Sequence, residues 1–368
     1  MSKGPDPRDY ALASRGVAQT AAPDLPYQPP VPRRFLPRIG VIGAGGIVDA
    51  HLDAYRTAKW DVAVICDRTL AKAETKRDGF YPNARATTSV HDVLNDPTIN
   101  IVDITVHPKD RPPLIDAALR AGKHVLSQKP FVLDLDEGER LCALARAQGL
   151  KLAVNQNGRW APHLAWMRAA VRRGLIGELI GFHVNLHWDH RWIAGTRFEQ
   201  IEDLILYDFG IHWFDFLVSV APGRARSVLA TAKLVPGAKV PLAAQVLVEL
   251  EGGQASFVFD GGAPYGARDT TYLAGTLGSL QSDGPDLGQQ EVWLTTDEGR
   301  AVPELKGTWF NDGFRGAMGA LCVAIEDDAE PENGAEANLE SLALAFAAIR
   351  SRQNNAPVRV GETRRLTL

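Results

Sequence analysis

The sequence has few cysteines, little net charge and no long apolar run, and each absence excludes a class of protein. Three of the 368 residues are cysteine, and their wide separation neither matches a metal motif nor gives an even set for disulfides. We therefore expect no bound metal and a reducing compartment, the cytoplasm. The formal net charge of −4 gives no reason to expect a nucleic-acid partner. Because no apolar segment has bilayer length and no signal peptide is recognisable, we expect no membrane association.

What is present is an ordinary globular composition on a chain long enough for two domains, with 45% hydrophobic and 23% charged residues. The chain begins with a proline-rich arm, residues 1–37, that has too few large apolar residues to build a core. For residues 1–22 we expect a disordered tail. For residues 23–37 two interpretations stay open, a tail or an arm that lies on a neighbouring subunit. The anchors of such an arm would be Leu25, Tyr27, Phe35 and Leu36.

Short apolar runs alternate with helical patterns from residue 38 onward. The predicted strands of this part are 39–43, 62–66, 99–106, 124–127 and 151–155. Regular β-α alternation predicts an α/β fold, with a Rossmann doubly wound parallel sheet in a dinucleotide-binding domain over residues 38–156. In residues 157–368, strand-like runs joined by glycine turns predict an α+β domain with an antiparallel sheet. Ligands bind at the carboxyl ends of parallel strands, so the residues after each run are candidate site residues.

The first predicted strand ends in a glycine turn that opens a helix, a pattern that binds a dinucleotide diphosphate. Gly43 permits the turn, and Gly45 lets the backbone approach the phosphates without a side chain in the way. Val48 stands where the usual motif has a third glycine or alanine. Asp67 lies 21 residues after the last glycine of the turn, where a carboxylate accepts from the adenosine ribose and disfavours a 2′-phosphate. We therefore expect NAD as the cofactor, with NADP possible because of the neighbouring Arg68. The other predicted cofactor-binding residues are Ala44, Gly46, Ile47, Thr105, His107, Gln128, Lys129 and Asn157.

Lys129 follows the fourth predicted strand, in the crevice where the nicotinamide end of the cofactor is expected. A lysine at this point can donate to a substrate hydroxyl and stabilise developing alkoxide character. The alternative is a solvated lysine at a strand end. Pro130 restricts the backbone immediately after it.

A second candidate group comes from a predicted helix that carries Asp208, His212 and Asp215 on one face among large apolar neighbours. An unpaired ionised group buried there would be costly, so these side chains either form a satisfied structural network or line a polar cavity. A histidine flanked by carboxylates is well placed as a proton acceptor, because a carboxylate orients the ring and stabilises its charged form. Both interpretations stay open at this point.

A third candidate group follows the last predicted strand and the start of the second half. Arg159 has donors suited to a polyhydroxylated ligand, and the alternative is a solvated loop. Trp160 and Trp188 have indole faces on which sugar rings stack. His183 and His187 share a strand face, but no third ligand is implied, so we predict no metal site.

The chain resembles the glucose–fructose oxidoreductase, inositol dehydrogenase and MocA-type (Gfo/Idh/MocA) family over about residues 38–352. The resemblance rests on an ordered set, namely the turn 43–47, Asp67, the segment 122–126, Lys129-Pro130 and the segment 208–212. It implies a second domain built on a large, mostly antiparallel open sheet that mediates a homodimer or homotetramer. It also implies a bound nicotinamide dinucleotide, a sugar or polyol substrate, a catalytic Lys129 and an Asp208–His212 pair. Gln128 stands where the family has glutamate.

The expected reaction is hydride transfer between the cofactor and a carbinol or carbonyl of a sugar, polyol or sugar derivative. We expect His212 to take the hydroxyl proton, Asp208 to orient its ring and Lys129 to hold the alkoxide. The predicted substrate-binding residues are Lys129, Arg159, Trp160, Trp188, Asp208 and His212. Two alternatives stay open. One is transient oxidation followed by β-elimination, in a lyase or a redox-assisted glycoside-cleaving enzyme. The other is a sensor of dinucleotide or sugar without turnover.

Overall fold

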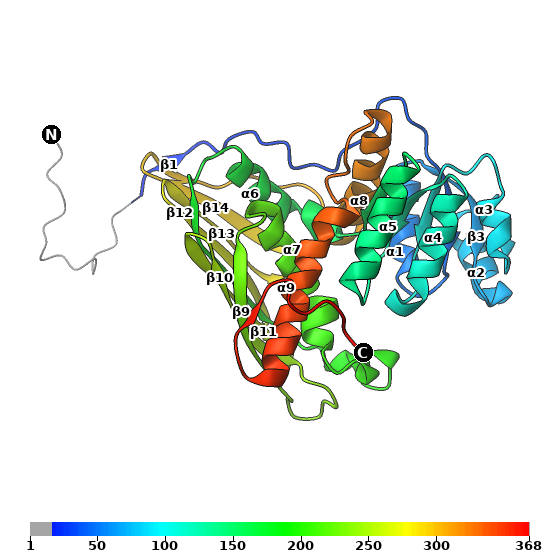
Figure 1. Cartoon of the computed structure of the whole chain (residues 1–368). Coiled ribbons are helices and arrows are strands. Elements are labelled where there is room, and N and C mark those ends of the chain that lie inside the picture. Colours follow the sequence, from blue (N-terminus) through cyan, green and yellow to red (C-terminus); the bar gives the residue numbers. More distant parts are fainter. Residues whose placement is uncertain (1–16, 368) are drawn as a thin grey trace, which may run out of the picture.

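Two β-sheets organise the chain in the computed structural model, which describes residues 17–367 (Figure 1). Within these residues the first sheet has six parallel strands in the order β4-β3-β2-β5-β6-β7. Helices cover both of its faces, which explains why its strands are near-continuous apolar runs. The strands are β2 (Arg38–Ile42), β3 (Asp61–Cys66), β4 (Arg85–Thr87), β5 (Ile101–Ile104), β6 (His124–Ser127) and β7 (Leu152–Val154). The helices are α1 (Val48–Thr57), α2 (Leu70–Phe80), α3 (Val90–Leu94), η1 (Pro108–Asp110), α4 (Arg111–Arg120) and α5 (Leu135–Ala147).

The second sheet has ten strands within the described part of the chain, in the order β1-β15-β14-β13-β12-β8-β11-β10-β9-β16. Its neighbouring strands are antiparallel, apart from the parallel pairs β8–β11 and β1–β15. The strands are β1 (Gln19–Thr20), β8 (Leu179–His187), β9 (Ala225–Lys233), β10 (Ala243–Leu250), β11 (Gly253–Asp260), β12 (Arg268–Gly275), β13 (Gly278–Asp286), β14 (Gln289–Thr296), β15 (Gly299–Ala301) and β16 (Val358–Arg359). The predicted fold class, a Rossmann sheet followed by a large, mostly antiparallel sheet, is confirmed.

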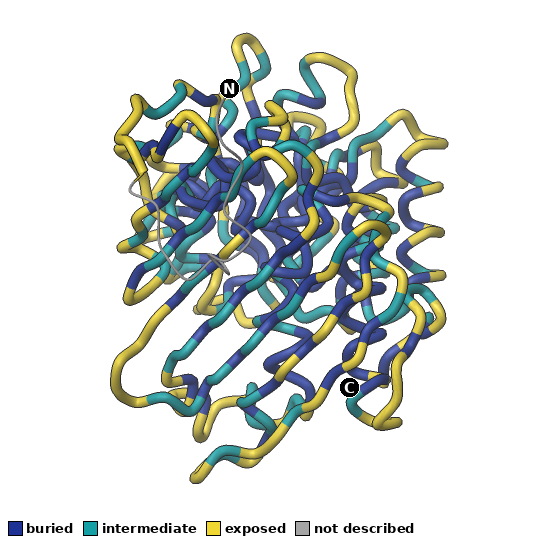
Figure 2. Tube along the Cα trace, turned by 90° about the vertical axis from the view of Figure 1, so that its left-hand side faces the viewer, coloured by how far each residue is buried: buried dark blue, intermediate teal, exposed yellow. Residues whose placement is uncertain are grey.

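Helices cover one face of the second sheet and leave the other face open (Figure 1). Along its strands buried residues alternate with exposed or half-buried ones, as expected for a sheet with one covered face (Figure 2). No helix among residues 17–367 combines the length and apolarity needed to cross a membrane. The remaining helices are η2 (Asn157–Trp160), α6 (Pro162–Arg172), η3 (Arg191–Ile193), η4 (Arg197–Gln200), the π-helix η5 (Ile205–Phe209), α7 (Ile211–Val220), α8 (Trp309–Glu326) and α9 (Ala335–Asn354).

The arm runs along its own chain, from the edge of the second sheet to the Rossmann half (Figure 1). The disordered tail that we expected for residues 1–22 is wrong at Gln19–Thr20, which pair with β15, while residues 1–16 lie outside the described residues. The free edge of β15 provides the backbone partners for this pairing. Of the predicted anchors, Leu25, Tyr27 and Phe35 pack against the cores of their own chain. Leu36 is 83% exposed.

Candidate active site

The glycine turn ends β2 and opens α1 in the predicted way. Gly43 has a φ of +111°, and a Cβ there would lie 2.6 Å from Thr105 Oγ1, so this position requires glycine. A Cβ on Gly45 or Gly46 would meet nothing within 4 Å, so the space above the turn is open. Backbone N–H groups at the start of a helix, with open space in front of them, fit a dinucleotide diphosphate.

A cleft of about 450 Å³ lies beside this turn, at the carboxyl edge of the parallel sheet. Asp67 lines the cleft, and its carboxylate is held by two backbone N–H groups, those of Ala44 at 2.8 Å and Thr69 at 2.9 Å. A carboxylate fixed at the end of β3 fits a ribose diol. The other predicted cofactor residues that line the cleft are Gly43, Gly45, Arg68, Thr105 and His107.

The cleft also has a wall that the sequence motifs missed. Arg197 of η4, in the second half of the chain, lines it together with Lys72 and Lys109. Burial lowers the pKa of His107, and the charge of Arg197 lowers it further. No local motif marks Arg197, because its position depends on how the loop after β8 folds over the Rossmann half.

The structure brings Lys129 and Asp208 together, two residues that we expected in the same site. Lys129 Nζ donates to the backbone oxygen of Asp208 at 2.8 Å and lies 3.3 Å from its Oδ2 atom. Both side chains are more than four-fifths buried, at 15% and 18% exposure, so the pair is partly shielded from solvent. The ammonium group follows β6, at the same edge of the sheet as the glycine turn.

His212 lies at the start of α7 with a neutral ring. Its Nδ1 atom is buried and has no hydrogen-bond partner among the described residues, and the ring meets that of Trp309 edge-on at 5.6 Å. Burial lowers the pKa of His212 well below its ordinary value, and the charge of Lys129 lowers it further. A neutral imidazole keeps a lone pair on one ring nitrogen, so His212 is in the form that can accept a proton.

We expected Asp208 to contact the His212 ring, but no hydrogen bond joins them among residues 17–367. Asp208 pairs with Lys129 instead. The cause is the π-helix η5, because its wider turn interrupts the α-helical register that the prediction assumed between Asp208 and His212.

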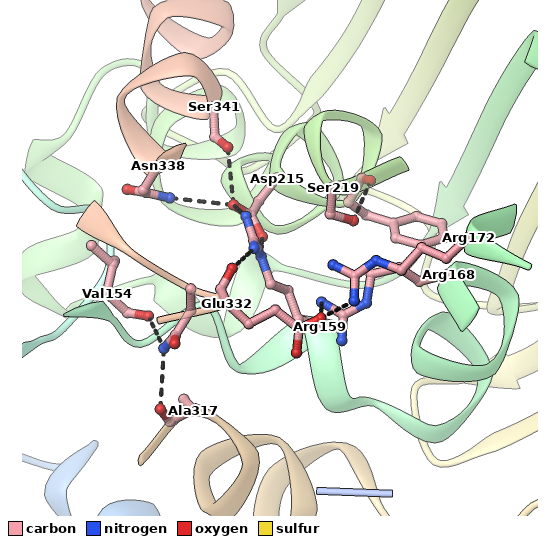
Figure 3. Close-up of polar contacts among 12 residues, drawn as sticks. Val154, Arg159, Arg168, Arg172, Asp215, Ser219, Ala317, Glu332, Asn338 and Ser341 are labelled. Carbon is pink, nitrogen blue, oxygen red and sulfur yellow. Dashed lines mark hydrogen bonds and ion pairs between the residues drawn. The ribbon is translucent and has the colours of Figure 1, made fainter. Parts of the chain in front are cut away.

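Asp215 belongs to a structural network and not to the cleft. It is 1% exposed, and Arg159 approaches it with Nε at 2.6 Å and Nη2 at 2.8 Å (Figure 3). Ser341 and Asn338 donate to the same carboxylate. We expected Arg159 to bind substrate, but the structure places it in this network. Its side chain is 4% exposed, and its guanidinium is bonded to Asp215 and to the backbone oxygen of Glu332.

Three other predicted site residues also face the interior. Trp160 packs against Gly316 of α8 and under the guanidinium of Arg168, and Asn157 packs against Gly313 of the same helix. Both are therefore part of the contact between η2 and α8. Trp188 is half-buried with its ring centroid 5.6 Å from that of Trp213, the residue next to His212.

Gln128 is buried in a polar network that the sequence reasoning missed. Its Oε1 atom accepts from Lys129 N at 2.7 Å and Asn155 Nδ2 at 3.2 Å, and its Nε2 atom lies 3.3 Å from His51 Nε2. The other ring nitrogen of His51 lies 2.8 Å from Asp103 Oδ2. The Gln128 amide therefore faces α1 and not the cleft. The sequence offered one signal for this network, because Asp103 is a carboxylate inside an otherwise apolar strand and so requires a buried partner.

Two sequence models of one family match the chain. Residues 37–156 match an oxidoreductase family with an NAD-binding Rossmann fold, and residues 164–281 match the GFO/IDH/MocA C-terminal domain. The chain belongs to the Gfo/Idh/MocA oxidoreductase family, and its first sheet is an NAD-binding Rossmann domain.

Individual relatives match either over about half of the chain or over most of it at lower sequence identity. The uncharacterized oxidoreductase YhhX of Escherichia coli is 32% identical over 166 residues, which are 45% of this chain and 47% of that protein. The chain thus spans about half the length of the first curated relatives that it matches. Inositol 2-dehydrogenase of Rhizobium meliloti is 26% identical over 85% of this chain and 96% of its own length. An oxidoreductase from Agrobacterium radiobacter, solved with NAD+, L-tartaric acid and magnesium, has a TM-score of 0.80 at 21% identity, covering 88% of this chain and 98% of that one. This likeness shows the fold.

Proposed function

We propose that the protein transfers a hydride between NAD and a carbinol or carbonyl carbon of a sugar, polyol or sugar derivative. The observation that carries the proposal is the Lys129 ammonium, held by Asp208 near a neutral His212 at the ligand-binding edge of an NAD-binding sheet. A proton acceptor and a cationic donor together suit the oxidation of an alcohol.

Each side chain has one role in this reaction. His212, which is half-buried, accepts the proton of the substrate hydroxyl at a ring nitrogen. Lys129 donates a hydrogen bond to the same oxygen and stabilises its negative charge as it develops, and Asp208 positions Lys129 rather than His212. Bound NAD supplies the hydride acceptor. The residues that would hold it are Gly43, Ala44, Gly45, Gly46, Ile47, Asp67, Arg68, Thr105 and His107.

The aromatic surroundings support a sugar or polyol as the substrate class. Trp188 is half-buried, and its ring centroid lies 5.6 Å from that of the buried Trp213, the residue next to His212, so the exposed part of Trp188 offers apolar surface near the histidine. Such surface packs against the C–H faces of a sugar ring. Relatives named inositol 2-dehydrogenase and D-apiose dehydrogenase, and a solved levoglucosan dehydrogenase, point to the same class.

A panel of sugars and polyols, each assayed with NAD and with NADP for absorbance of the reduced nicotinamide, tests the proposal. We expect turnover with NAD, and Lys129→Ala to reduce kcat/KM by roughly 10²- to 10⁴-fold with NAD affinity retained. Lys76→Ala is the control, because Lys76 has a similar exposure, 17%, but pairs with Asp49 of α1 and not with Asp208. Consumption of substrate without accumulation of NADH would indicate the elimination reaction instead, and binding without turnover would indicate a sensor.

We also propose that copies of the chain meet at the open face of the second sheet, as a homodimer or homotetramer. Leu229 on β9, Leu247 on β10 and Tyr272 on β12 are large apolar side chains that are exposed on this sheet. Leu247→Glu is expected to shift the mass measured by light scattering towards the monomer. Leu277→Glu, at the tip of the β12–β13 hairpin, is the control, and an unchanged mass for Leu247→Glu would contradict the assignment.

We further propose a cytoplasmic location, because all three cysteines of the chain are buried and free.

A further inference from the structure

A second cavity, of about 440 Å³, lies between the arm and α6, and it is separate from the cleft beside the glycine turn. One wall is formed by Tyr27 and Gln28 of the arm, and the other by Trp160 and by arginines of α6 and its end. The arm wall is fixed in place. The backbone N–H of Lys306 donates to the Tyr27 hydroxyl at 2.9 Å, and Gln28 Nε2 donates to the Lys306 carbonyl at 3.1 Å.

The cavity has an excess of positive charge. Arg168, Arg172 and Arg173 line it together with a single carboxylate, that of Glu332. Arg172 pairs with Glu332, and Arg168 Nη1 lies 3.6 Å from the same carboxylate (Figure 3). Burial would raise the pKa of Glu332, but the charges of Arg168 and Arg172 outweigh burial and lower it, so Glu332 is ionised. Three cations and one anion leave two positive charges without a counterion.

Arg168 is the buried centre of this cluster. Its side chain is 5% exposed, and its guanidinium lies over the Trp160 ring at 5.3 Å. The Nη1 atom is buried, and the Glu332 carboxylate at 3.6 Å is beyond hydrogen-bond distance from it. Burial lowers the pKa of Arg168 to about 10, which leaves it charged at neutral pH. Glu332 is shared between Arg168 and Arg172, so its single negative charge does not balance the cluster.

We propose that this cavity binds a small molecule that carries a phosphate or carboxylate group. The acid group occupies the space among Arg168, Arg172 and Arg173, whose guanidinium groups suit bidentate contacts to such oxygens. The rest of the molecule packs against the ring of Tyr27 and the neighbouring prolines of the arm, Pro26 and Pro30. The size of the cavity fits a small-molecule site.

The site has a direct structural connection to the proposed active site through η2. Trp160 ends this helix in the cavity, and Gly158 within it lies so close to His212 that a Cβ there would be 3.5 Å from Nδ1. Arg159, between them, holds Asp215 of α7. An occupant of the cavity therefore contacts the same short helix that packs against His212, and it bridges the arm to α6.

Calorimetric titration of the full chain with inorganic phosphate and, separately, with succinate tests the proposal, at an ionic strength kept constant with chloride. We expect saturable binding of at least one probe, and at least tenfold weaker binding by Arg173→Gln and by Arg172→Gln. These two side chains are exposed, so their replacement leaves the fold intact. Comparing the two probes identifies which acid group the site prefers.

Two control variants make the test specific. Arg120→Gln removes an arginine that pairs with Asp116 on the surface of α4, and we expect unchanged binding. Arg68→Gln removes an arginine of the NAD cleft, where phosphate could also bind. Loss of binding in Arg68→Gln but not in Arg173→Gln would overturn the proposal, as would the absence of saturable binding of both probes to the unaltered chain. The readout is independent of turnover, so failure here is distinguishable from failure of the proposed reaction.

Discussion

Asp215 lies three residues after His212, and replacing it by asparagine tests whether its carboxylate is structural or catalytic. The Asp215–Arg159 pair is almost fully buried, at 1% and 4% exposure, and Ser341 and Asn338 also donate to the Oδ1 atom of the carboxylate. Asp215→Asn leaves the Arg159 guanidinium buried without a counterion. Removal of one partner of a buried pair costs about 3–5 kcal/mol, so we expect the free energy of unfolding to fall by that amount.

The assay is urea unfolding followed by tryptophan fluorescence, together with kcat/KM of the folded variant. Asp61→Asn is the matched control, because Asp61 pairs with Arg38 at an exposed position, where such a pair contributes about 0–1 kcal/mol. The double variant Arg159→Met/Asp215→Leu is expected to recover most of the lost stability, because no unpaired charge remains. A loss below about 1 kcal/mol for Asp215→Asn, combined with a large loss of kcat/KM, would refute the structural assignment.

Three further predictions concern the cleft, the base and the second sheet. Gly43→Ala is expected to lower the free energy of unfolding by about 1–3 kcal/mol and to weaken NAD binding, because φ is +111° and Thr105 Oγ1 is 2.6 Å from the added Cβ. Calorimetric titration with NAD measures the binding, and an unchanged NAD affinity would contradict the prediction. Burial lowers the pKa of His212, so we expect the acid limb of the pH profile of kcat/KM, which reports its protonation in the free enzyme, to lie below the ordinary value of 6.5. An acid limb above 6.5 would contradict the assignment of a buried base. Burial raises the pKa of Asp269 to about 8, with Asp283 and Asp286 adding to the shift. The folded chain thus keeps a proton that the unfolded chain releases above 3.8, and stability falls as pH rises from there towards 8. Asp269→Asn is expected to remove this dependence and to stabilise the fold near pH 8 by roughly 1–3 kcal/mol in urea unfolding, whereas an unchanged dependence would contradict the assignment.

Features carried by local sequence were predictable. The turn at Gly43, the carboxylate of Asp67 and the strand-end lysine Lys129 each depend on a few consecutive residues and on the rule that ligands gather at the carboxyl edge of a parallel sheet. The alternating runs of residues 38–156 predicted the parallel sheet for the same reason, because burial on both faces leaves a clear apolar signature.

The features that could not be predicted depend on contacts between distant segments. A π-helix before His212 changed the partner of Asp208, and periodicity that assumes an α-helix cannot reveal it. Arg159 was assigned to substrate because its partner, Asp215, lies 56 residues away and reaches it only through the packing of η2 against α7. The contribution of Arg197 to the cleft has the same origin.

The short strand β1 has a consequence for how the protein behaves in a crowded solution. It occupies the outer side of β15, where a row of backbone N–H and C=O groups would otherwise face solvent. Bare sheet edges recruit strands from other molecules and start aggregation. The arm therefore protects the sheet of its own chain from such pairing. Proteolytic removal of residues up to 22 would expose the edge of β15 and promote aggregation.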